Sequence, residues 1–421
     1  MSKSGTIIKV ATSKITGSVK APPSKSMMIR GIVAGLLANG KTFLRNPSRC
    51  DDAMAAMQVS KDLGATIEEI GEDIVIHGGN NILKTTLNCE ESGLSIRMFS
   101  AVAALHDIEI TLDGTGSLID RPVDMLVEPL EDLGVKVSTN NGYLPIRIKG
   151  PLSGGNTKVD GSQSSQFLTG LLMSLPLVDG NSQIIIDNLK SKPYIDMTMR
   201  LMEDFGVKVE HTNYKIFTIK GNQKYKAHEY PVEGDWSGAA FLLVAGAIGG
   251  ELEVTNLDTK SKQADIQILK ALEMAGADLE IKENSVKVSN GKLKAFSMDI
   301  TDCPDLAPPL VTLAAYCEGT SHLTGTERLF IKESNRAKTL QQEFAKLGIK
   351  VLIHDNEMFI DGGEIKGGSI YSHGDHRIAM AGATAAIGAT GPVIIEKAES
   401  VSKSWPDFFV DISNIGGIVY E

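Results

Sequence analysis

Two hydrophobic patterns alternate along the chain. The first is a run of small and apolar residues with almost no polar face, as in SMMIRGIVAGLL, SIRMFSAVAAL and AAFLLVAGAI. Helices that are hydrophobic on all sides are expected to be buried. The second is an amphipathic helix that ends in glycine and continues into a β-rich stretch, as in EDLGVKVS and EDFGVKVE. We therefore predict an α/β protein in which buried helices, amphipathic helices and short strands alternate.

Both patterns repeat with nearly the same period of about 70 residues. The glycines that follow the amphipathic helices are Gly64, Gly134, Gly206, Gly276, Gly348 and either Gly416 or Gly417. The buried helices are predicted to start near Ser24, Gly93, Ser164, Gly234, Asp305 and Gly374. Glycine supplies the left-handed conformation that commonly ends a helix before the chain turns into a strand. The sequence thus predicts six units, each with a strand, a buried helix, a second strand, an amphipathic helix and a strand pair.

Units of this size are expected to pack in threes, which gives two compact domains with a core each. A linear solenoid is the alternative, but its repeats usually run about 20–50 residues. The boundary between the third and fourth units falls near EYPVEGDW, and the equivalent entry to the first unit is SVKAPPSKS. We therefore predict one domain over 20–232 and a second domain formed by 1–19 together with 233–421.

Composition and charge narrow the function classes. The 421 residues carry a formal net charge of −10, which argues against a basic nucleic-acid-binding domain. The four cysteines have no paired spacing, so we expect free thiols in a reducing compartment. The N-terminal segment lacks the apolar run of a signal peptide, and the longest apolar stretch, 239–248, is shorter than the roughly 20 residues of a membrane span. We expect a cytoplasmic protein with no membrane or nucleic-acid partner.

Basic residues occur where buried helices begin, although a cation there opposes the helix dipole. These residues are Lys25, Arg30, Arg97 and Arg377. Loops before the amphipathic helices add Arg121, Lys332, Arg336 and Lys403. If equivalent positions of the six units face one place, a pocket for a small polyanion forms in an otherwise acidic protein, lined by Lys25, Arg30, Arg121, Lys332, Arg336, Arg377 and Lys403. For each cation alone, a solvated surface position is the alternative, and the Ser and Asp residues at helix starts are also ordinary N-caps.

Two carboxylates, Asp305 and Glu333, fall among these cations and are candidates for proton transfer. The chain has no G-x-x-x-x-G-K-[ST], complete G-x-G-x-x-G, H-E-x-x-H or G-x-S-x-G motif, so ATP, NAD and catalytic zinc are not supported. His373 and His376 are spaced like a metal pair, but no third ligand is evident. We therefore predict no metal site.

Ten short motifs together resemble one enzyme family. In chain order they are PPSKSMMIR, ESGLSIR, DRPVDML, VDGSQSSQFLTGLLM, SKPYIDMT, VEGDWSGAAF, CPDLAP, IKESNR, GDHRIAMA and SVSKSWPDFF. They extend from Lys25 to Phe409 and are similar to the motifs of the 5-enolpyruvylshikimate-3-phosphate synthases. The resemblance implies the two-domain enolpyruvyl transferase fold, with three βαβαββ units in each domain and the active site in the interdomain cleft.

The resemblance also implies a reaction. Members of the family transfer the enolpyruvyl group of phosphoenolpyruvate to the 5-hydroxyl of shikimate 3-phosphate and release phosphate. The reaction proceeds by addition and elimination through a tetrahedral intermediate, in the shikimate pathway of aromatic amino acid biosynthesis. Because phosphoenolpyruvate is already activated, no cofactor is expected. The implied partners are the two small-molecule substrates, with glyphosate as a candidate inhibitor, and we expect a monomer.

Carried over position by position, the resemblance implies three sets of site residues. The catalytic set comprises Asp305, which would take the 5-hydroxyl proton, Glu333, which would protonate the methylene carbon, and Lys25. Shikimate 3-phosphate is expected at Lys25, Ser26, Arg30, Ser164, Ser165, Gln166, Ser191, Tyr194, Asp305 and Lys332. Phosphoenolpyruvate is expected at Lys25, Gly93, Arg121, Gln166, Arg336, Arg377 and Lys403, where Gly93 would let the backbone approach the ligand.

Two other functions remain open from the sequence. UDP-N-acetylglucosamine enolpyruvyl transferases have the same fold and donor, but they usually carry a reactive cysteine on a mobile loop before the position of Arg121, where Cys89 is the only candidate. A non-catalytic anion-binding homologue would keep the fold without the chemistry. The presence of Asp305, Glu333 and Lys25 argues against this second alternative.

The chain departs from the common family pattern at two places. Glu91-Ser92-Gly93-Leu94 stands where many members have Asn-Ala-Gly-Thr, and Arg328 stands where some members have Asn. These differences bear on the affinity for phosphoenolpyruvate and on glyphosate sensitivity rather than on the class of reaction.

Overall fold

The chain forms two compact units. The computed structural model describes residues 5–79, 81–162 and 164–420. Unit 1 comprises Met1–Pro22 and Glu233–Glu421, and unit 2 comprises Pro23–Val232. The chain therefore passes from one unit to the other twice, after Pro22 and after Val232.

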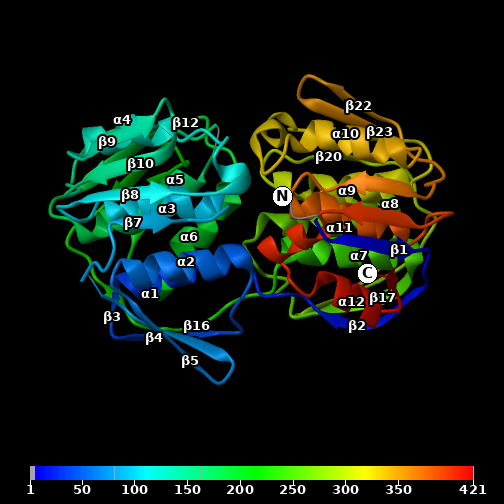
Figure 1. The fold of residues 1–421 in the computed structure, drawn as a ribbon, viewed down its shortest axis with the longest axis horizontal. Helices are drawn as coiled ribbons and strands as arrows, with labels where there is room; N and C mark the ends of the chain where they lie inside the picture. Colours follow the sequence, from blue (N-terminus) through cyan, green and yellow to red (C-terminus); the bar gives the residue numbers. More distant parts are fainter. Residues whose placement is uncertain (1–4, 80, 163, 421) are drawn as a thin grey trace. The chain divides into compact units, whose positions relative to one another are not determined.

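Buried helices form the core of each unit, as the apolar pattern predicts. In unit 2 they are α1 (Lys25–Leu37), α3 (Gly93–Ala103) and α5 (Gln166–Ser174), and in unit 1 they are α7 (Trp236–Gly249), α9 (Ala307–Ala315) and α11 (His376–Ala386). Helix α3 packs against α1 and α5, and α7, α9 and α11 contact one another (Figure 1). Small residues permit this packing: a Cβ at Gly170 of α5 would lie 2.8 Å from the carbonyl oxygen of Met98 in α3.

A second set of helices is amphipathic and covers the sheets. It consists of α2 (Asp51–Asp62), α4 (Val127–Asp132), α6 (Lys192–Asp204), α8 (Ile268–Ala275), α10 (Arg336–Lys346) and α12 (Phe408–Asn414). The glycine that follows each of them has a positive φ, between 80° and 109°, at Gly64, Gly134, Gly206, Gly276, Gly348 and Gly416. The predicted left-handed helix ends are confirmed, and the sixth falls at Gly416.

Each of the two units contains three four-stranded sheets, one for each of its three predicted repeats. Unit 2 contains β4 (Lys41–Arg45), β5 (Thr66–Ile70), β6 (Asp73–His77), β7 (Thr86–Asn88), β8 (Glu109–Asp113), β9 (Lys136–Asn140), β10 (Tyr143–Lys149), β11 (Asn156–Asp160), β12 (Ser182–Asp187), β13 (Val209–Thr212), β14 (Ile216–Ile219), β16 (Glu229–Pro231) and the short pair β3 (Ala38–Asn39) and β15 (Tyr225–Lys226). Their orders are β7-β8-β10-β9, β11-β12-β14-β13 and β16-β4-β6-β5.

Unit 1 repeats the same plan. It contains β1 (Ile7–Ala11), β2 (Ile15–Lys20), β17 (Gly250–Thr255), β18 (Asp278–Ile281), β19 (Ser285–Ser289), β20 (Ser297–Asp299), β21 (Thr320–Thr324), β22 (Val351–His354), β23 (Glu357–Asp361), β24 (Gly368–Tyr371), β25 (Val393–Glu396) and β26 (Ile418–Tyr420). Their orders are β24-β25-β1-β26, β18-β19-β17-β2 and β20-β21-β23-β22. Each of the six sheets has one parallel pair, such as β20 with β21, and two antiparallel pairs.

Three of these strands pair with strands that are far away in sequence. Strand β2 precedes α1 in sequence but pairs parallel with β17 of unit 1. Strand β16 precedes α7 but pairs parallel with β4 of unit 2. Strand β1, near the N-terminus, pairs with both β25 and the C-terminal β26. Two sheets of unit 1 are therefore completed by the N-terminal strands β1 and β2, which are separated in sequence from their partners by the whole of unit 2.

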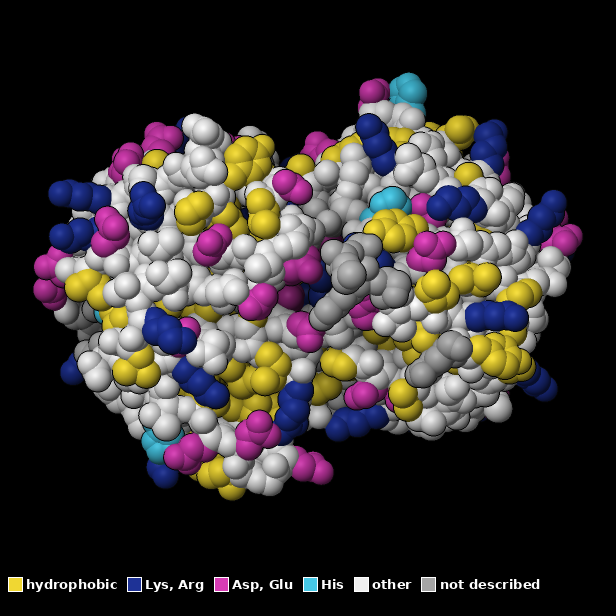
Figure 2. Space-filling view, in the orientation of Figure 1, with side chains coloured by type: hydrophobic (Ala, Val, Ile, Leu, Met, Phe, Trp, Pro, Cys, Tyr) yellow, Lys and Arg dark blue, Asp and Glu magenta, His cyan; other side chains and the backbone are white. Residues whose placement is uncertain are grey.

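Short 3-10 helices connect the main elements. They are η1 (Gly116–Leu118), η2 (Asp124–Leu126), η3 (Leu175–Leu177), η4 (Ala264–Gln267), η5 (Pro304–Leu306), η6 (Glu327–Ile331) and η7 (Ala398–Lys403). The face drawn in Figure 2 carries basic and acidic side chains interspersed rather than a field of one sign. None of the helices described by the structure has the length and apolar character needed to span a bilayer.

Candidate active site

In unit 2, Lys25 begins α1 beside a carboxylate. Ser24 caps this helix by accepting a hydrogen bond from the Met27 amide. Nζ of Lys25 lies 2.9 Å from Oδ2 of Asp52, in the first turn of α2, and the two side chains are only 13% and 10% exposed. Asp52 therefore offsets part of the unfavourable interaction between Lys25 and the dipole of α1. The sequence pattern did not assign this partner.

One turn further along α1, Arg30 is fully buried among neutral acceptors. Its Nε donates to Oγ1 of Thr198 at 2.9 Å, Nη1 to the Ser26 carbonyl at 2.9 Å, and Nη2 to the Tyr194 carbonyl at 3.3 Å. Burial lowers the pKa of Arg30 to about 10. In the part of the chain that the structure describes, no carboxylate bonds to this guanidinium. A buried cation without a counter-charge is costly, so an anionic ligand would stabilise it.

A threonine network ties Arg30 to the starts of α5 and α6. Oγ1 of Thr198 in α6 donates to the Tyr194 carbonyl at 2.8 Å and lies 3.2 Å from Oγ1 of Thr169 in α5. Thr169 in turn donates to the Ser165 carbonyl at 3.2 Å. Predicted residues from three helices are thereby held together, and neither threonine was identified from the sequence.

The serines that were predicted as site residues at the starts of α5 and α6 are buried. Oγ of Ser164, the residue before the N-cap Ser165, accepts the amide of Gln166 at 3.2 Å. Ser191, directly before α6, has a left-handed φ of 57° and its carbonyl accepts the Tyr194 amide. Such a conformation is uncommon for serine and marks a constrained turn.

Gly93, at the start of α3, makes room for a cation. A Cβ at this position would lie 2.2 Å from Nη1 of Arg121 and 3.0 Å from Nη1 of Arg97. Arg97 Nη1 donates to the Gly93 carbonyl at 3.1 Å and to Oε1 of Gln166 at 3.0 Å. Arg97, which the sequence marks only as a cation at a helix start, therefore orients the predicted ligand residue Gln166 while Gly93 leaves space for Arg121.

Glu91 is turned toward a loop of the same unit. Its Oε2 accepts the amide and the hydroxyl of Ser117, each at 2.9 Å, in η1. The carboxylate that departs from the family pattern thus stabilises this short helix.

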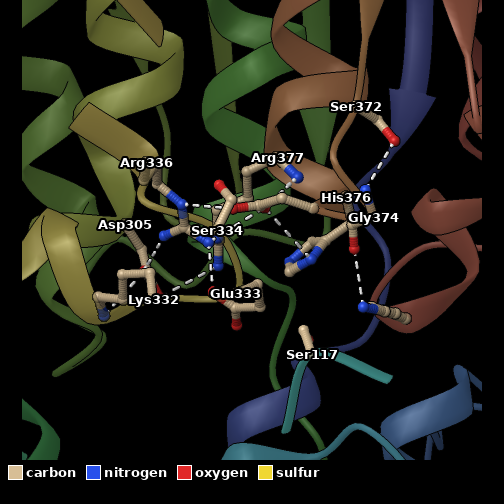
Figure 3. Close-up of polar contacts among 12 residues, drawn as sticks. Ser117, Asp305, Lys332, Glu333, Ser334, Arg336, Ser372, Gly374, His376 and Arg377 are labelled. Atoms are coloured by element: carbon tan, nitrogen blue, oxygen red, sulfur yellow. Dashed lines mark hydrogen bonds and ion pairs between the residues drawn. The ribbon is translucent and has the colours of Figure 1, made fainter. Parts of the chain in front are cut away.

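In unit 1, Asp305 in η5 is surrounded by cations. Oδ1 accepts hydrogen bonds from Nη1 of Arg336 at 2.9 Å and from Nζ of Lys332 at 3.3 Å, and Oδ2 accepts one from Nη2 of Arg377 at 3.2 Å (Figure 3). Burial alone would raise the pKa of Asp305, but the charges of Arg377, Lys332 and Arg336 together hold it well below the usual range. The carboxyl is therefore ionised at neutral pH.

Arg336, the first residue of α10, bonds to three carboxylates. Besides Asp305, Nη2 donates to Oε2 of Glu333 at 2.6 Å and Nε donates to Oδ2 of Asp375 at 2.9 Å. Its side chain is fully buried, which by itself lowers the pKa, but the three carboxylates raise the pKa above the usual value. Two of these carboxylates, Asp305 and Glu333, are the predicted proton-transfer groups.

The pKa of Lys332 is shifted from its ordinary value. Burial lowers its pKa to about 8, the attraction of Asp305 opposes this shift, and the like charges of Arg328 and Arg336 add to it. The amine therefore loses its proton within the range accessible to activity measurements.

The segment before α11 connects the remaining predicted cations. Asp375 caps α11 by accepting the Arg377 amide at 3.0 Å. Nζ of Lys403, in η7, donates to the Gly374 carbonyl at 2.7 Å. Asp375 thus bonds to the backbone of Arg377, and its neighbour Gly374 bonds to the side chain of Lys403. Buried Asp375 also bonds to Arg336, so it links α10 to α11.

Each unit therefore gathers its share of the predicted residues. In unit 1, Asp305, Lys332, Glu333, Arg336 and Arg377 form one hydrogen-bonded cluster, and Lys403 joins it through Gly374. In unit 2, Arg30 bonds to Ser26 and Tyr194 and is connected to Ser165 through the threonine network. Arg97 links Gly93 with Gln166, and Lys25 pairs with Asp52. Among the described residues, no group of three His, Cys, Asp or Glu side chains is arranged to hold a metal ion.

The fold matches those of solved enolpyruvyl transferases. The enolpyruvyl transferase NikO from Streptomyces tendae is 14% identical, covers 99% of each chain and has a TM-score of 0.79, which shows a common fold. An EPSP synthase from Acinetobacter baumannii is 26% identical, with a TM-score of 0.84 over 99% of this chain and 100% of that chain. The chain therefore belongs to the class of proteins with the enolpyruvyl transferase fold, and the predicted fold is confirmed.

Sequence relatives define the family within that class. The model of the family "EPSP synthase (3-phosphoshikimate 1-carboxyvinyltransferase)" matches residues 10–412. The 3-phosphoshikimate 1-carboxyvinyltransferases of Clostridium perfringens strain 13 and Clostridium novyi are 40% and 37% identical, and each match covers 98% of this chain and at least 98% of the relative. The chain belongs to the EPSP synthase family, a transferase family of the shikimate pathway. The predicted family and reaction are confirmed, and the UDP-N-acetylglucosamine alternative is not favoured.

Proposed function

We propose that the residue clusters of units 1 and 2 act on one pair of substrates, shikimate 3-phosphate and phosphoenolpyruvate, and that the two units are the functional domains of the enzyme. The two clusters differ in how their cations are balanced. Unit 2 contributes Arg30, whose described partners are all neutral, whereas unit 1 contributes cations already paired with carboxylates. Two phosphates and one carboxylate on the substrates would need several such cations.

For shikimate 3-phosphate, the proposed ligands are buried or half-buried residues that lie mostly at or near helix starts. They are Lys25, Ser26, Arg30, Ser164, Ser165, Gln166, Ser191, Tyr194, Asp305 and Lys332. Arg30 is suited to the phosphate because its planar guanidinium is fixed by Thr198 and two carbonyls, so little side-chain entropy is lost on binding. Lys332 would add a point charge.

For phosphoenolpyruvate, the proposed ligands are mostly arginines. They are Lys25, Gly93, Arg121, Gln166, Arg336, Arg377 and Lys403. Guanidinium groups suit the paired oxygens of carboxylate and phosphate. Gly93 supports this assignment because any side chain there would displace Arg121.

The proposed chemistry assigns a proton to each step. Asp305 takes the proton of the 5-hydroxyl as its oxygen attacks C2 of phosphoenolpyruvate, and Glu333 gives a proton to C3, which becomes a methyl group. The tetrahedral intermediate then expels phosphate from C2 with the bonding electron pair, and the methyl group returns a proton to the Glu333 carboxylate, which restores the double bond. Lys25 stabilises the charge that moves during these steps.

The low pKa of Asp305 is compatible with this base role. Arg377, Lys332 and Arg336 suppress its basicity in the free protein. Substrate phosphate and carboxylate groups bound to the same cations would weaken that effect and raise the pKa of Asp305 toward a useful value. The base would thus become active when both substrates are bound.

The observation that carries the proposal is the unit 1 cluster, where Asp305 and Glu333 share Arg336. The test is phosphate release by the purified protein with both substrates, with each substrate omitted in turn. We expect release only with both, and none when UDP-N-acetylglucosamine replaces shikimate 3-phosphate. Retained binding of shikimate 3-phosphate without release would overturn the enzymatic function and favour an anion-binding homologue.

Three further expectations belong to this proposal. The protein acts as a monomer in the cytoplasm. It needs no cofactor, because the donor phosphoenolpyruvate is already activated. Glyphosate competes with phosphoenolpyruvate. Binding of shikimate 3-phosphate draws the two units together and excludes water, so small-angle scattering should show a smaller radius of gyration. An unchanged radius would argue against closure.

A further inference from the structure

The segment Ser372–Asp375, between β24 and α11, holds two of the proposed phosphoenolpyruvate ligands. Its Gly374 carbonyl accepts a hydrogen bond from Nζ of Lys403 at 2.7 Å, and its Asp375 carboxylate accepts one from Nε of Arg336 at 2.9 Å. The path of this segment therefore determines where both cations lie.

Two successive residues of the segment have left-handed backbone conformations. His373 has a φ of 56° and Gly374 has a φ of 68°. Glycine adopts this conformation freely, whereas histidine does so only when surrounding contacts compensate for the strain. Ser372 contributes one such contact, because its hydroxyl donates to the Lys397 carbonyl and accepts the Gly374 amide.

A buried glutamate supplies the side-chain contact. Glu343 lies in α10, two turns after Arg336, and is 2% exposed as a residue. Its Oε1 lies 2.9 Å from Nε2 of His373, and its Oε2 accepts the Tyr371 amide at 2.9 Å and Nζ of Lys346 at 2.6 Å. Burial alone would raise the pKa of Glu343, but the hydrogen bonds from Lys346, His373 and the Tyr371 amide lower it, so the group is a carboxylate at neutral pH.

We propose that Glu343 and His373 form a latch that fixes the segment Ser372–Asp375 and thereby positions Lys403 and Arg336 for phosphoenolpyruvate. Both are positioning residues, since they act through the Gly374 carbonyl and the Asp375 carboxylate. Glu343 and Arg336 lie on the same helix, so the latch ties the segment to the helix that bears one of the cations it positions. This inference rests on the proposed role of Lys403 and Arg336.

The latch has a specific kinetic consequence. Release of His373 from Glu343 would let the segment relax, which shifts the Gly374 carbonyl and with it Nζ of Lys403. Arg30, proposed to bind the phosphate of shikimate 3-phosphate, is held by Thr198, Ser26 and Tyr194 of unit 2. We expect KM for phosphoenolpyruvate to rise about tenfold, an energy in the range of one lost charged hydrogen bond, while KM for shikimate 3-phosphate stays within twofold.

The test compares substitutions that separate ring packing, hydrogen bonding and backbone strain. H373F keeps an aromatic ring against Tyr371, whose ring centre is 4.9 Å away, but cannot bond to Glu343. H373Q keeps a hydrogen-bonding group, and H373G removes the side chain while relieving the left-handed strain. H354F is the matched control, because His354 at the end of β22 is exposed.

We expect H373F and H373G to raise KM for phosphoenolpyruvate, H373Q to stay near wild type, and H354F to change nothing. Calorimetric titration with phosphoenolpyruvate in the presence of shikimate 3-phosphate should show the same loss of affinity without turnover. The latch is overturned if H373F binds phosphoenolpyruvate as tightly as wild type, if both KM values rise equally, or if H373G behaves as wild type. Absence of phosphate release by the wild-type protein would instead overturn the proposed function, while the binding data still decide on the latch.

Discussion

Nη1 of Arg336 donates to Oδ1 of Asp305 at 2.9 Å, although Arg336 begins α10 and Asp305 lies before α9. The same buried guanidinium bonds to Glu333 and Asp375. One cation thus fixes the proposed base, the proposed acid and the cap of α11. Because three carboxylates neutralise it, Arg336 can remain charged without contact with water.

Glu333 is expected to act in the chemical step rather than in binding. In E333Q the amide oxygen can still accept Nη2 of Arg336, so the cluster should keep its geometry, but the side chain can no longer donate a carboxylic proton. We expect kcat to fall by about 10²–10⁴-fold, with both KM values changed less than threefold. Phosphate release under single-turnover conditions measures this effect, and near-wild-type turnover would remove Glu333 from the mechanism.

Lys332 should make the binding of shikimate 3-phosphate sensitive to pH. Burial lowers its pKa to about 8, so the amine loses its charge as the pH rises through 8. If Lys332 binds the phosphate, KM for shikimate 3-phosphate rises above this pH. K332R should abolish the rise because a guanidinium stays protonated. A flat KM between pH 7 and 9.5 in the wild-type protein would contradict the assignment.

Loss of the Lys332 proton weakens the binding of shikimate 3-phosphate, but it makes the contribution of Lys332 to stability more favourable. The pKa of Lys332 is about 8 in the folded state, below the ordinary lysine value of 10.5 that applies to the unfolded chain, so the unfolded chain binds more protons between pH 8 and 10.5. The contribution of Lys332 to the free energy of unfolding is least favourable below pH 8 and improves as the pH rises through this window. Denaturant titrations of wild type and K332M at pH 7.5 and 9.5 test the sign. The wild-type protein should gain relative to K332M at the higher pH.

Thr198 is expected to support shikimate 3-phosphate binding through Arg30. In T198V the buried Nε of Arg30 loses its acceptor, which costs about 1–3 kcal/mol. The free energy of unfolding should fall by a similar amount, and KM for shikimate 3-phosphate should rise by about tenfold. T198S keeps the hydroxyl and serves as the control. Equal behaviour of T198V and T198S would show that the hydroxyl is not required.

Gly93 should matter for phosphoenolpyruvate alone. In G93A the new Cβ would lie 2.2 Å from Nη1 of Arg121, so the guanidinium must move. We expect KM for phosphoenolpyruvate to rise at least tenfold, the effect of about 1.4 kcal/mol, while affinity for shikimate 3-phosphate is retained. Steady-state kinetics with each substrate varied in turn measure the difference. Unchanged KM for phosphoenolpyruvate would place Arg121 outside its binding site.

Local sequence signals were sufficient for most of the repeat. Positive φ at Gly64 and its five equivalents follows from the spacing of amphipathic helices and glycines, and the apolar runs identify the buried helices. The motifs also identified the cations. What they did not provide was the partner of each cation: Asp52 for Lys25, Thr198 for Arg30 and Gln166 for Arg97. These partners lie on other helices, so no local spacing marks them.

The sequence by itself determined the six units, their element order and the residue types available for anion binding, because helix and strand periodicity and glycine conformation are local properties. The tertiary structure alone decided which strands complete each sheet. It pairs β2 with β17 and β16 with β4, and it places β1 between β25 and β26. It also decided that Arg336 is fully neutralised while Arg30 is surrounded by neutral groups. Both outcomes depend mainly on contacts between residues far apart in sequence, whose free energy arises only when the helices and strands within each unit have packed.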